Sequence, residues 1–403
     1  MTERLLSNDS LAITLLCAHL GSPKSSGLAP LSDSEWDSLA ERVARSPLKT
    51  PSGLFSKSAA QIQEDLGIDQ RLADRIGGLL ARSGQMAFEI ERLTSMGIWI
   101  LTRADSQYPR QLRRRLRLRA PTLFFGMGDR NVMTSPGVAV VGSRELDDDS
   151  LLFATNIGRA AARAKQTVYS GGSRGADATA MRAAVAAGGK AVGILADSLE
   201  RSLRDVESRE YMEAGSLCLV SPFHPNAPFR AGNAMARNKI IYCLASFAVV
   251  IASTNGKGGT WAGATEALKH KWVPVFTRGG KDAPIGNQRL LEFGARPVPA
   301  DRESDPESLA AWMQLVSQEI ASPERLLTTA PREIFDLVWP LIHQFLTSPR
   351  TEDDVASRFH ILSVQVSEWL TLAESRGLAR RSPHGWVAGS ATHAAQGSLF
   401  EDV

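Results

Sequence analysis

The stretch that decides the fold is Gly137–Arg144, with the sequence Gly-Val-Ala-Val-Val-Gly-Ser-Arg. Its short apolar run, residues 138–141, is closed by a glycine, which predicts a strand of a buried parallel sheet. The acidic run Asp147–Ser150 follows and predicts the start of a helix. A turn from a strand into a helix exposes N–H groups that suit a phosphate, and Arg144 adds a positive charge there. We therefore expect an open α/β sheet with a ligand site at the carboxyl ends of its strands.

The same pattern recurs further along the chain. Thr167–Ser170 runs into the glycine-rich segment Gly171–Asp177, and Phe247–Ile251 runs into Asn255–Thr260. Ser216–Val220 is another apolar run of strand length. Because the carboxyl ends of parallel strands share one edge of a sheet, these turns are expected to converge on a phosphate-binding groove.

Length, composition and charge restrict the class of protein to which the chain can belong. A chain of 403 residues predicts two or three domains, and an apolar content of 43% is typical of a globular protein without membrane spans. Asp9 before the apolar run Leu11–Leu20 argues against a signal peptide. Cys17, Cys218 and Cys243 show no metal-binding spacing and indicate a reducing, cytoplasmic setting. We expect no cofactor, no metal and no membrane contact, and a net charge of +3 means that any nucleic-acid role rests on local clusters.

Five segments are expected along the chain. They are an N-terminal helical domain (1–85), the sheet domain (86–300), a linker with a helix (301–330), a winged-helix domain (331–390) and a flexible tail (391–403). The turn Leu66–Ile68 resembles that of helix-hairpin-helix modules, which contact DNA phosphates, although a helical bundle without a ligand fits equally well. The winged helix suits DNA or protein contact, and the sequence leaves this open.

An arginine-rich run, Arg110–Arg119, precedes the central strand. A charge run is usually a solvated face. Arginine interleaved with leucine also suits a ridge that follows phosphates beside the groove. Both interpretations stay open.

The order of these signals resembles the DprA/Smf (DNA-processing protein A) family over about residues 86–300. The segments that carry the resemblance are GIWILTRADSQYP (97–109), APTLFFG (120–126), VAVVGSR (138–144), YSGGSRGADATAM (169–181), MARNKIIYCLA (235–245), GGTWAGATEAL (258–268) and IGNQRLLEFGA (285–295). The resemblance implies an extended Rossmann-like fold that binds single-stranded DNA without sequence preference. It also implies a homodimer that loads a RecA-type recombinase onto DNA, during natural transformation where the host is competent.

The resemblance also implies which residues bind phosphates, and no catalytic residue is expected. By motif match they are Gly142, Ser143, Arg144, Ser170, Gly171, Arg174, Gly175, Arg237, Asn238 and Lys239. The residues themselves add Arg230 as a cation and the turn Gly258, Gly259 and Thr260. The aromatic side chains of Phe223, Phe229 and Trp261 are candidates for stacking on bases, and core packing is the alternative for each.

Three departures from the family pattern indicate a divergent branch and put the transformation role in doubt. Pro222 follows Ser221 where the family usually has an acidic residue. Gly258–Ala264 replaces the family's Ser-Gly-Ser-Leu-Ile-Thr-Ala turn, and the loop Phe223–Phe229 also differs.

Two other functions fit the same kind of sheet. The turn before Glu266 loosely resembles that of LOG-like nucleoside-monophosphate phosphoribohydrolases, which cleave an N-glycosidic bond. Glu266 lies six residues past Thr260 instead of three, which displaces it along the helix. A nucleotide-sensing module of a defence system would use the same pocket without turnover.

The tail carries a separate signal. Gln396, Leu399 and Phe400 are similar to the Gln-x-x-Leu-Phe peptide with which bacterial replication and repair proteins dock on the β sliding clamp. A short segment of this kind loses little conformational entropy on binding. The alternatives are a hydrophobic plug on the winged helix and a chance match.

Overall fold

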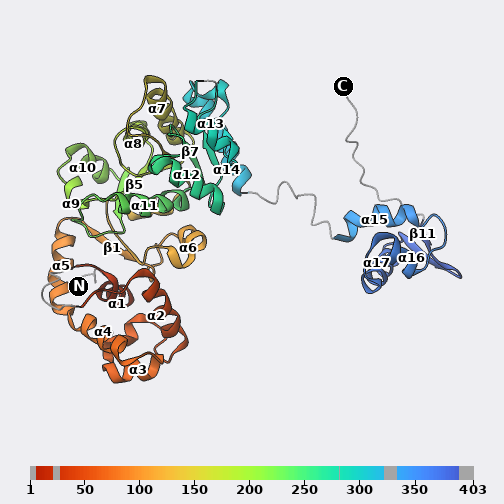
Figure 1. The fold of residues 1–403 in the computed structure, drawn as a ribbon, viewed down its shortest axis with the longest axis horizontal. Coiled ribbons are helices and arrows are strands. Elements are labelled where there is room, and N and C mark those ends of the chain that lie inside the picture. The colour runs from red at the N-terminus through yellow and green to blue at the C-terminus, as the bar shows by residue number, and fades with distance from the viewer. Residues whose placement is uncertain (1–5, 21–27, 281, 322–333, 390–403) are drawn as a thin grey trace. The chain divides into compact units, whose positions relative to one another are not determined.

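A computed structural model describes residues 6–20, 28–280, 282–321 and 334–389. The chain divides into two compact units, Met1–Ile320 and Ala321–Val403 (Figure 1). No helix in these described ranges is long and apolar enough to cross a membrane.

The first unit is built on a sheet whose described strands lie in the order β1-β2-β6-β5-β4-β3-β7-β8-β9. The strands are β1 (Trp99–Thr102), β2 (Leu123–Met127), β3 (Gly137–Val141), β4 (Thr167–Ser170), β5 (Ala191–Ile194), β6 (Leu217–Ser221), β7 (Phe247–Val250), β8 (Val275–Thr277) and β9 (Arg296–Pro297). From β6 to β9 all neighbours are parallel, and β1 and β2 add an antiparallel extension beside β6. The chain winds outward from β3 to β6 and then returns to the other side of β3 as β7. This reversal between β3 and β7 is where an open α/β sheet binds its ligands.

Helices cover both faces of the sheet. One face carries α7 (Asp148–Arg163), α8 (Ala176–Ala186) and α14 (Pro306–Ala321), and the other carries α6 (Arg110–Leu116), α11 (Ala231–Leu244), α12 (Gly258–His270) and α13 (Ile285–Glu292). Side chains alternate along β3, so Val138 and Val140 join the first core while Ala139 and Val141 join the second. The expected α/β class with a mostly parallel sheet is confirmed.

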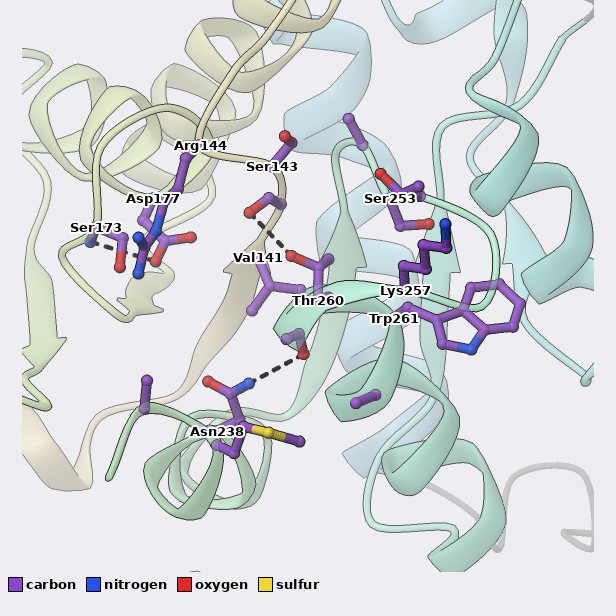
Figure 2. Close-up of a pocket in the computed structure, with 18 of the residues that line it drawn as sticks. Val141, Ser143, Arg144, Ser173, Asp177, Asn238, Ser253, Lys257, Thr260 and Trp261 are labelled. Carbon is purple, nitrogen blue, oxygen red and sulfur yellow. Dashed lines mark hydrogen bonds between the residues drawn. The ribbon is translucent and has the colours of Figure 1, made fainter. Parts of the chain in front are cut away.

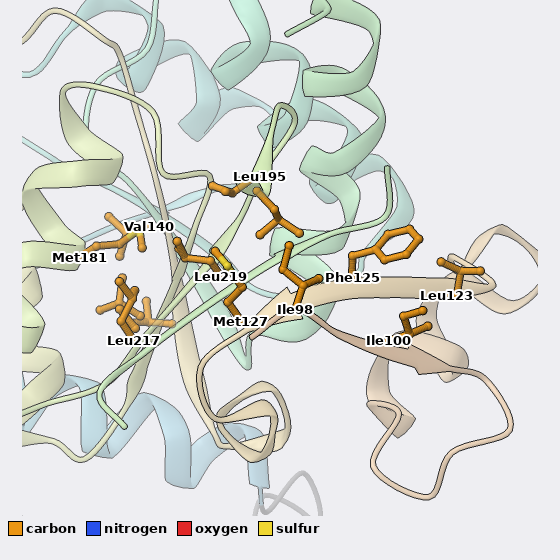
Figure 3. Close-up of a cluster of buried hydrophobic side chains, with 14 of the residues drawn as sticks. Ile98, Ile100, Leu123, Phe125, Met127, Val140, Met181, Leu195, Leu217 and Leu219 are labelled. Atoms are coloured by element: carbon orange, nitrogen blue, oxygen red, sulfur yellow. The ribbon is translucent and has the colours of Figure 1, made fainter. Parts of the chain in front are cut away.

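The N-terminal helices pack directly against the sheet extension. They are α1 (Asn8–Cys17), α2 (Asp33–Arg45), α3 (Ala59–Leu66), α4 (Gln70–Ala81) and α5 (Ser83–Ser95). Their core is continuous with that of the sheet, and Figure 3 follows it from Ile100 and Leu123 to Leu217 and Met181. The carboxylate of Asp33 anchors this region, because its Oδ1 accepts hydrogen bonds from the Thr122 N–H (3.0 Å) and hydroxyl (2.6 Å).

Local signals placed most element boundaries well. Asp147 caps α7 through its carboxylate, and Gly67, at φ +60°, ends α3 as expected for a tight helical hairpin. The strand β5 was not expected from the sequence, because its four residues include Gly193 and lack a longer apolar run. Between β5 and β6 lie two short helices, α9 (Leu199–Ser202) and α10 (Val206–Glu213).

The side chains of the arginine-rich run fall into a buried group and an exposed group. Leu112 and Leu116 are buried against the sheet, and Arg115 turns inward to donate to the carbonyl oxygens of Cys243 and Ala245 at the end of α11. The other five arginines of the run are exposed: Arg110, Arg113, Arg114, Arg117 and Arg119. One arginine is therefore structural, and the others form a solvated basic face.

The second unit has the element order of a winged helix. It comprises α15 (Ile334–Phe345), α16 (Glu352–Phe359), α17 (Ser363–Ser375) and a hairpin of β10 (Ala379–Ser382) with β11 (Gly385–Ala388). Thr351 and Asp354 form a capping box at the start of α16. Trp339, Leu370 and Trp386 lie in its core. The expected clamp-binding residues of the tail lie outside the described part of the chain.

Replacing Trp312 of α14 measures how much the packing of this helix against the sheet contributes to stability. Its side chain is 7% exposed, with ring centroids 5.0 Å from Phe276 and 6.0 Å from Phe247. We expect Trp312→Ala to lower the free energy of unfolding of the first unit by about 3–5 kcal/mol. Leu315→Ala, on the exposed side of the same helix, is the matched control and should change it by less than about 0.5 kcal/mol. Urea unfolding followed by circular dichroism measures both, and equal effects would contradict the packing.

Candidate functional site

The turns after β3 and β7 enclose a cavity of about 630 Å³ together with α11 and the start of α12. We call it the switch-point cavity. It is lined by residues 141–144 and 252–254, by residues 256–262 and by one side of α11. Figure 2 shows Ser173 and Asp177 on one side of the cavity, Lys257 and Trp261 on the other, and Thr260 between them.

Backbone hydrogen bonds fix the shape of the cavity. The Ser143 N–H donates to the Ala252 carbonyl oxygen (2.9 Å), which joins the turn after β3 to the turn after β7. The Ala176 N–H donates to the Ser143 carbonyl oxygen (3.1 Å), and the Thr260 hydroxyl donates to the Gly142 carbonyl oxygen (3.0 Å). A Cβ on Gly142 would lie 2.5 Å from that of Ala176, so only glycine permits this approach.

The first turn of α12 offers an anion site. Gly258 adopts φ +83°, which turns the chain into the helix, and no side chain among the described residues caps its N-terminus. The Asn238 amide donates to the Gly259 carbonyl oxygen (3.1 Å) and holds the turn against α11. The first N–H groups of this 13-residue helix therefore remain available to a negatively charged ligand.

Exposed cations and aromatic rings stand around the opening. The Arg144 guanidinium carbon lies 5.2 Å from the centroid of the Phe229 ring, and both side chains are exposed. Lys257 is exposed at the start of α12, and the Trp261 ring packs edge-on against Phe293. The mouth thus combines exposed positive charge with flat apolar faces.

A buried arginine lies deeper in the cavity. Arg237 is 5% exposed, its Nη2 donates weakly to the Ser173 hydroxyl (3.4 Å), and its Nε has no partner among the described residues. Burial lowers the pKa of Arg237, while nearby Asp177 opposes that shift. A Cβ on Gly171 would lie 1.7 Å from the Arg237 Nη1, so glycine at this position makes room for the guanidinium. Such an unsatisfied buried cation attracts an anion.

Two further buried groups face the same space. Asp177 supplies the carboxylate among the described lining residues, and burial raises its pKa to about 6 against the opposing effect of Arg237. The Tyr242 hydroxyl has no hydrogen-bond partner in the described chain, and burial raises its pKa. Of these two groups, Asp177 is the one that changes its charge, at about pH 6.

The residues expected to bind phosphate divide into groups. Eight of them line the switch-point cavity: Gly142, Ser143, Arg144, Arg237, Asn238, Gly258, Gly259 and Thr260. Ser170 is buried and donates to the Val140 carbonyl oxygen (2.6 Å), and Gly171 lies beneath Arg237. Arg174 and Gly175 line a different hollow between α7 and α8.

Arg230 and Lys239 line neither of these places. They face a second cavity on the opposite side of α11. Of the aromatic candidates, Phe229 and Trp261 line the switch-point cavity, and Phe223 lines the second cavity.

The sequence interpretation missed the two ionisable residues Lys257 and Asp177 among those that line the switch-point cavity. Lys257 stands immediately before Gly258 and Gly259, so its place at a helix start was a usable signal. Asp177 lies in the first turn of α8, but its burial near a guanidinium is not visible in the sequence. Glu266, the expected catalytic residue of the phosphoribohydrolase alternative, does not line the cavity.

The sheet and its helices define a Rossmann-like α/β protein with a cavity where the strand order reverses. Residues 99–305, just over half of the chain, match the family model of the DNA recombination-mediator protein A. The chain belongs to this family.

Solved structures also resemble the chain. The DNA processing protein A of Streptococcus pneumoniae is 20% identical, with 70% of this chain and 98% of that chain covered and a TM-score of 0.49. The Helicobacter pylori protein, whose structure is described in terms of single-stranded DNA binding, is 20% identical over 50% of this chain and 90% of its own, with a TM-score of 0.42. A molybdenum cofactor carrier protein of Chlamydomonas reinhardtii is 22% identical over 45% and 99%, with a TM-score of 0.32. No curated protein sequence matches the chain.

Asp177 makes stability depend on pH in a defined direction. Its pKa is about 6 in the folded chain against an ordinary 3.8, so its ionisation destabilises the fold as the pH rises from about 4 to above 6. We expect Asp177→Asn to match the wild type near pH 4 and to exceed it by roughly 3 kcal/mol at pH 7.5. Urea unfolding at a series of pH values measures the difference, and a difference that does not vary with pH would contradict the burial of this carboxyl.

Proposed function

We propose that the protein is a single-stranded DNA-binding recombination mediator and that the switch-point cavity holds part of the strand. One observation carries this proposal: an uncapped helix start, two exposed cations and a buried arginine meet at the reversal point of the sheet. Membership of the recombination-mediator family and the single-stranded DNA binding of the Helicobacter pylori relative support it.

The chemistry of the cavity suits the sugar–phosphate backbone. Lys257 and Arg144 are exposed and release counterions when they meet phosphates, which is the main source of non-specific affinity. The N–H groups at the start of α12 add fixed donors. Strand binding of this kind makes no demand on base identity.

The aromatic rings at the mouth suit the bases. Phe229 is 50% exposed, so much of its ring is open to contact, and Trp261 lines the cavity with partial exposure. Every base has a flat face, and stacking on such rings contributes about 1–3 kcal/mol per base without reading sequence. A duplex keeps its bases stacked internally, so these rings favour single strands.

Binding without turnover fits the cavity better than glycoside cleavage does. The carboxylate of the described lining is Asp177, which faces Arg237 in a buried setting, and Glu266 is absent from the lining. We infer that the protein is not a phosphoribohydrolase. A nucleotide-sensing function would use the same cavity. The exposed cations at the opening of the cavity, Arg144 and Lys257, favour a ligand longer than a single nucleotide.

We further propose that the protein acts as a homodimer and loads a RecA-type recombinase onto the bound strand, as the family resemblance implies. Recombination mediation is the family description that supports this proposal. We propose a role in natural transformation separately, because the turns after β6 and at the start of α12 differ from the family pattern. We assign the winged-helix unit to DNA or protein contact.

Replacing the two exposed cations tests the DNA-binding proposal. We expect the double variant Arg144→Ala/Lys257→Ala to lose about tenfold affinity or more for oligothymidine and to flatten its salt dependence by about 0.7 per lost phosphate contact. Filter binding at several salt concentrations measures both quantities, for single-stranded and duplex DNA. The control Arg209→Ala/Arg289→Ala removes the same charge from exposed positions outside the switch-point cavity and outside the hollow between α7 and α8. An unchanged slope in a folded Arg144→Ala/Lys257→Ala variant would refute the proposal.

We also propose that the tail docks on the β sliding clamp through Gln396, Leu399 and Phe400. A peptide of residues 392–403 is expected to bind purified clamp with micromolar affinity, because two adjacent apolar side chains fill a pocket at small entropic cost. Fluorescence anisotropy measures the affinity, and Leu399→Ala with Phe400→Ala should abolish it. The idea fails if neither the peptide nor the full-length protein binds.

A further inference from the structure

A second cavity of about 740 Å³ lies between the N-terminal helices and the sheet extension. Its wall includes Arg119 from the arginine-rich run, and Arg230 and Lys239 from the start and the middle of α11. Phe223 and His224 contribute ring faces from the loop after β6. Like the switch-point cavity, it thus combines cations with aromatic surface.

The positive charge of the second cavity is not used by the fold. In the described part of the chain, none of Arg119, Arg230 and Lys239 has an ion-pair or side-chain hydrogen-bond partner. The carboxylate of the cavity, Asp33, is already occupied by the Thr122 N–H and hydroxyl. Among the described lining residues three cations thus outnumber the one carboxylate, and none of the three forms an ion pair.

Helix α11 is the wall between the two cavities. Ala231, Ala234, Asn238 and Tyr242 face the switch-point cavity, at the i, i+3, i+7 and i+11 positions of one helical face. The residues Asn233, Ala236, Lys239 and Ile240 face the second cavity. One helix therefore presents a different side to each cavity.

The two cavities come close to each other at the start of α11. Phe229 lines the switch-point cavity, while its neighbours Pro228 and Arg230 line the second, so the two cavities approach each other across this loop. The residues at the start of the helix are Ala231 and Gly232, both exposed, and a Cβ on Gly232 would meet open space. The first two positions of the helix therefore carry only small side chains, next to the exposed Phe229 and Arg230.

One residue of the arginine-rich run, Arg119, lies in the wall of the second cavity. Arg119 belongs to the same run as Arg113, Arg114 and Arg117, which are exposed on α6 and the turn that follows it. The helix α6 packs against α11, and the turn 117–119 packs against α2. A ligand that leaves the second cavity on this side meets further phosphate-binding charge.

We propose that one single strand of DNA occupies both cavities, crossing the start of α11 between them. This inference rests on the proposed function and extends it, because it adds Arg119, Arg230, Lys239 and Phe223 to the path of the strand. Paired cations and ring faces on both sides of α11 favour a nucleic acid over an acidic peptide, which would need no ring faces at repeated intervals. The path makes the binding site longer than the switch-point cavity alone.

The test compares strand lengths in a variant of the second cavity. We expect Arg119→Ala/Lys239→Ala to bind a 20-nucleotide oligothymidine about tenfold more weakly than the wild type and to flatten its salt slope by about 1.4, for two lost phosphate contacts. A 4-nucleotide oligothymidine, which is held by the switch-point cavity, should lose less than about twofold. Arg209→Ala/Arg289→Ala serves as the charge-matched control, and thermal unfolding checks that each variant is folded.

The outcomes separate this inference from the proposed function. Unchanged binding of the long strand in Arg119→Ala/Lys239→Ala, with weakened binding in Arg144→Ala/Lys257→Ala, would overturn the continuous path and leave the proposed function standing. Unchanged binding in both variants would overturn both. An equal loss for the short and the long strand would mean that the second cavity acts alone and would also overturn the path.

Discussion

The backbone hydrogen bond from Ser143 to Ala252 ties the ends of β3 and β7 together, and the ligand face of the protein depends on it. The two strands are neighbours in the sheet, but the chain leaves them in different directions, toward α7 and toward α12. The opening between these exits is the switch-point cavity. Gly142 allows the contact, because a side chain there would collide with Ala176 at the start of α8. Glycine at this position therefore lets the turn after β3 lie directly against the start of α8.

Two charged side chains, Arg237 and Asp177, are buried at the floor of the cavity at a cost in stability. Placing Arg237 and Asp177 away from water carries a desolvation cost that their mutual attraction only partly offsets. The fold tolerates this because both groups are held by rigid elements, α11 and α8. A phosphate in the cavity would supply the partner that the Arg237 Nε lacks within the described chain. On the proposed function, this contact would offset part of the desolvation cost that the free protein carries.

The arginine-rich run shows how one composition serves two purposes. Arg115 satisfies carbonyl groups at the end of α11 and so helps to fix the helix that separates the two cavities. Its neighbours Arg114 and Arg117 point to solvent and remain free to meet phosphates. The anchoring of the N-terminal helices through Asp33 completes the second cavity, because these helices form its far wall. Structural and solvent-exposed arginines are thus interleaved in one short segment.

The sequence by itself determined the elements whose signals are local. The strand β3 follows from a valine-rich run closed by glycine, and the starts of α7 and α16 follow from the capping residues Asp147 and Thr351. Four or five adjacent residues are enough to specify such features, and the order of the motifs was enough to indicate the family. The short strand β5 escaped prediction because its stability comes from its neighbours β4 and β6.

Only the tertiary structure decided how the cations are shared between sites. Arg237 and Lys239 are two residues apart in one motif, yet they face different cavities because successive residues of a helix point in different directions. Which direction meets which cavity depends on how α11 lies between the sheet, α12 and the N-terminal helices. The same holds for Asp177, whose raised pKa arises from burial by segments distant in the sequence. Local pattern specifies a helix or a turn, whereas burial and charge environment are properties of the packed whole.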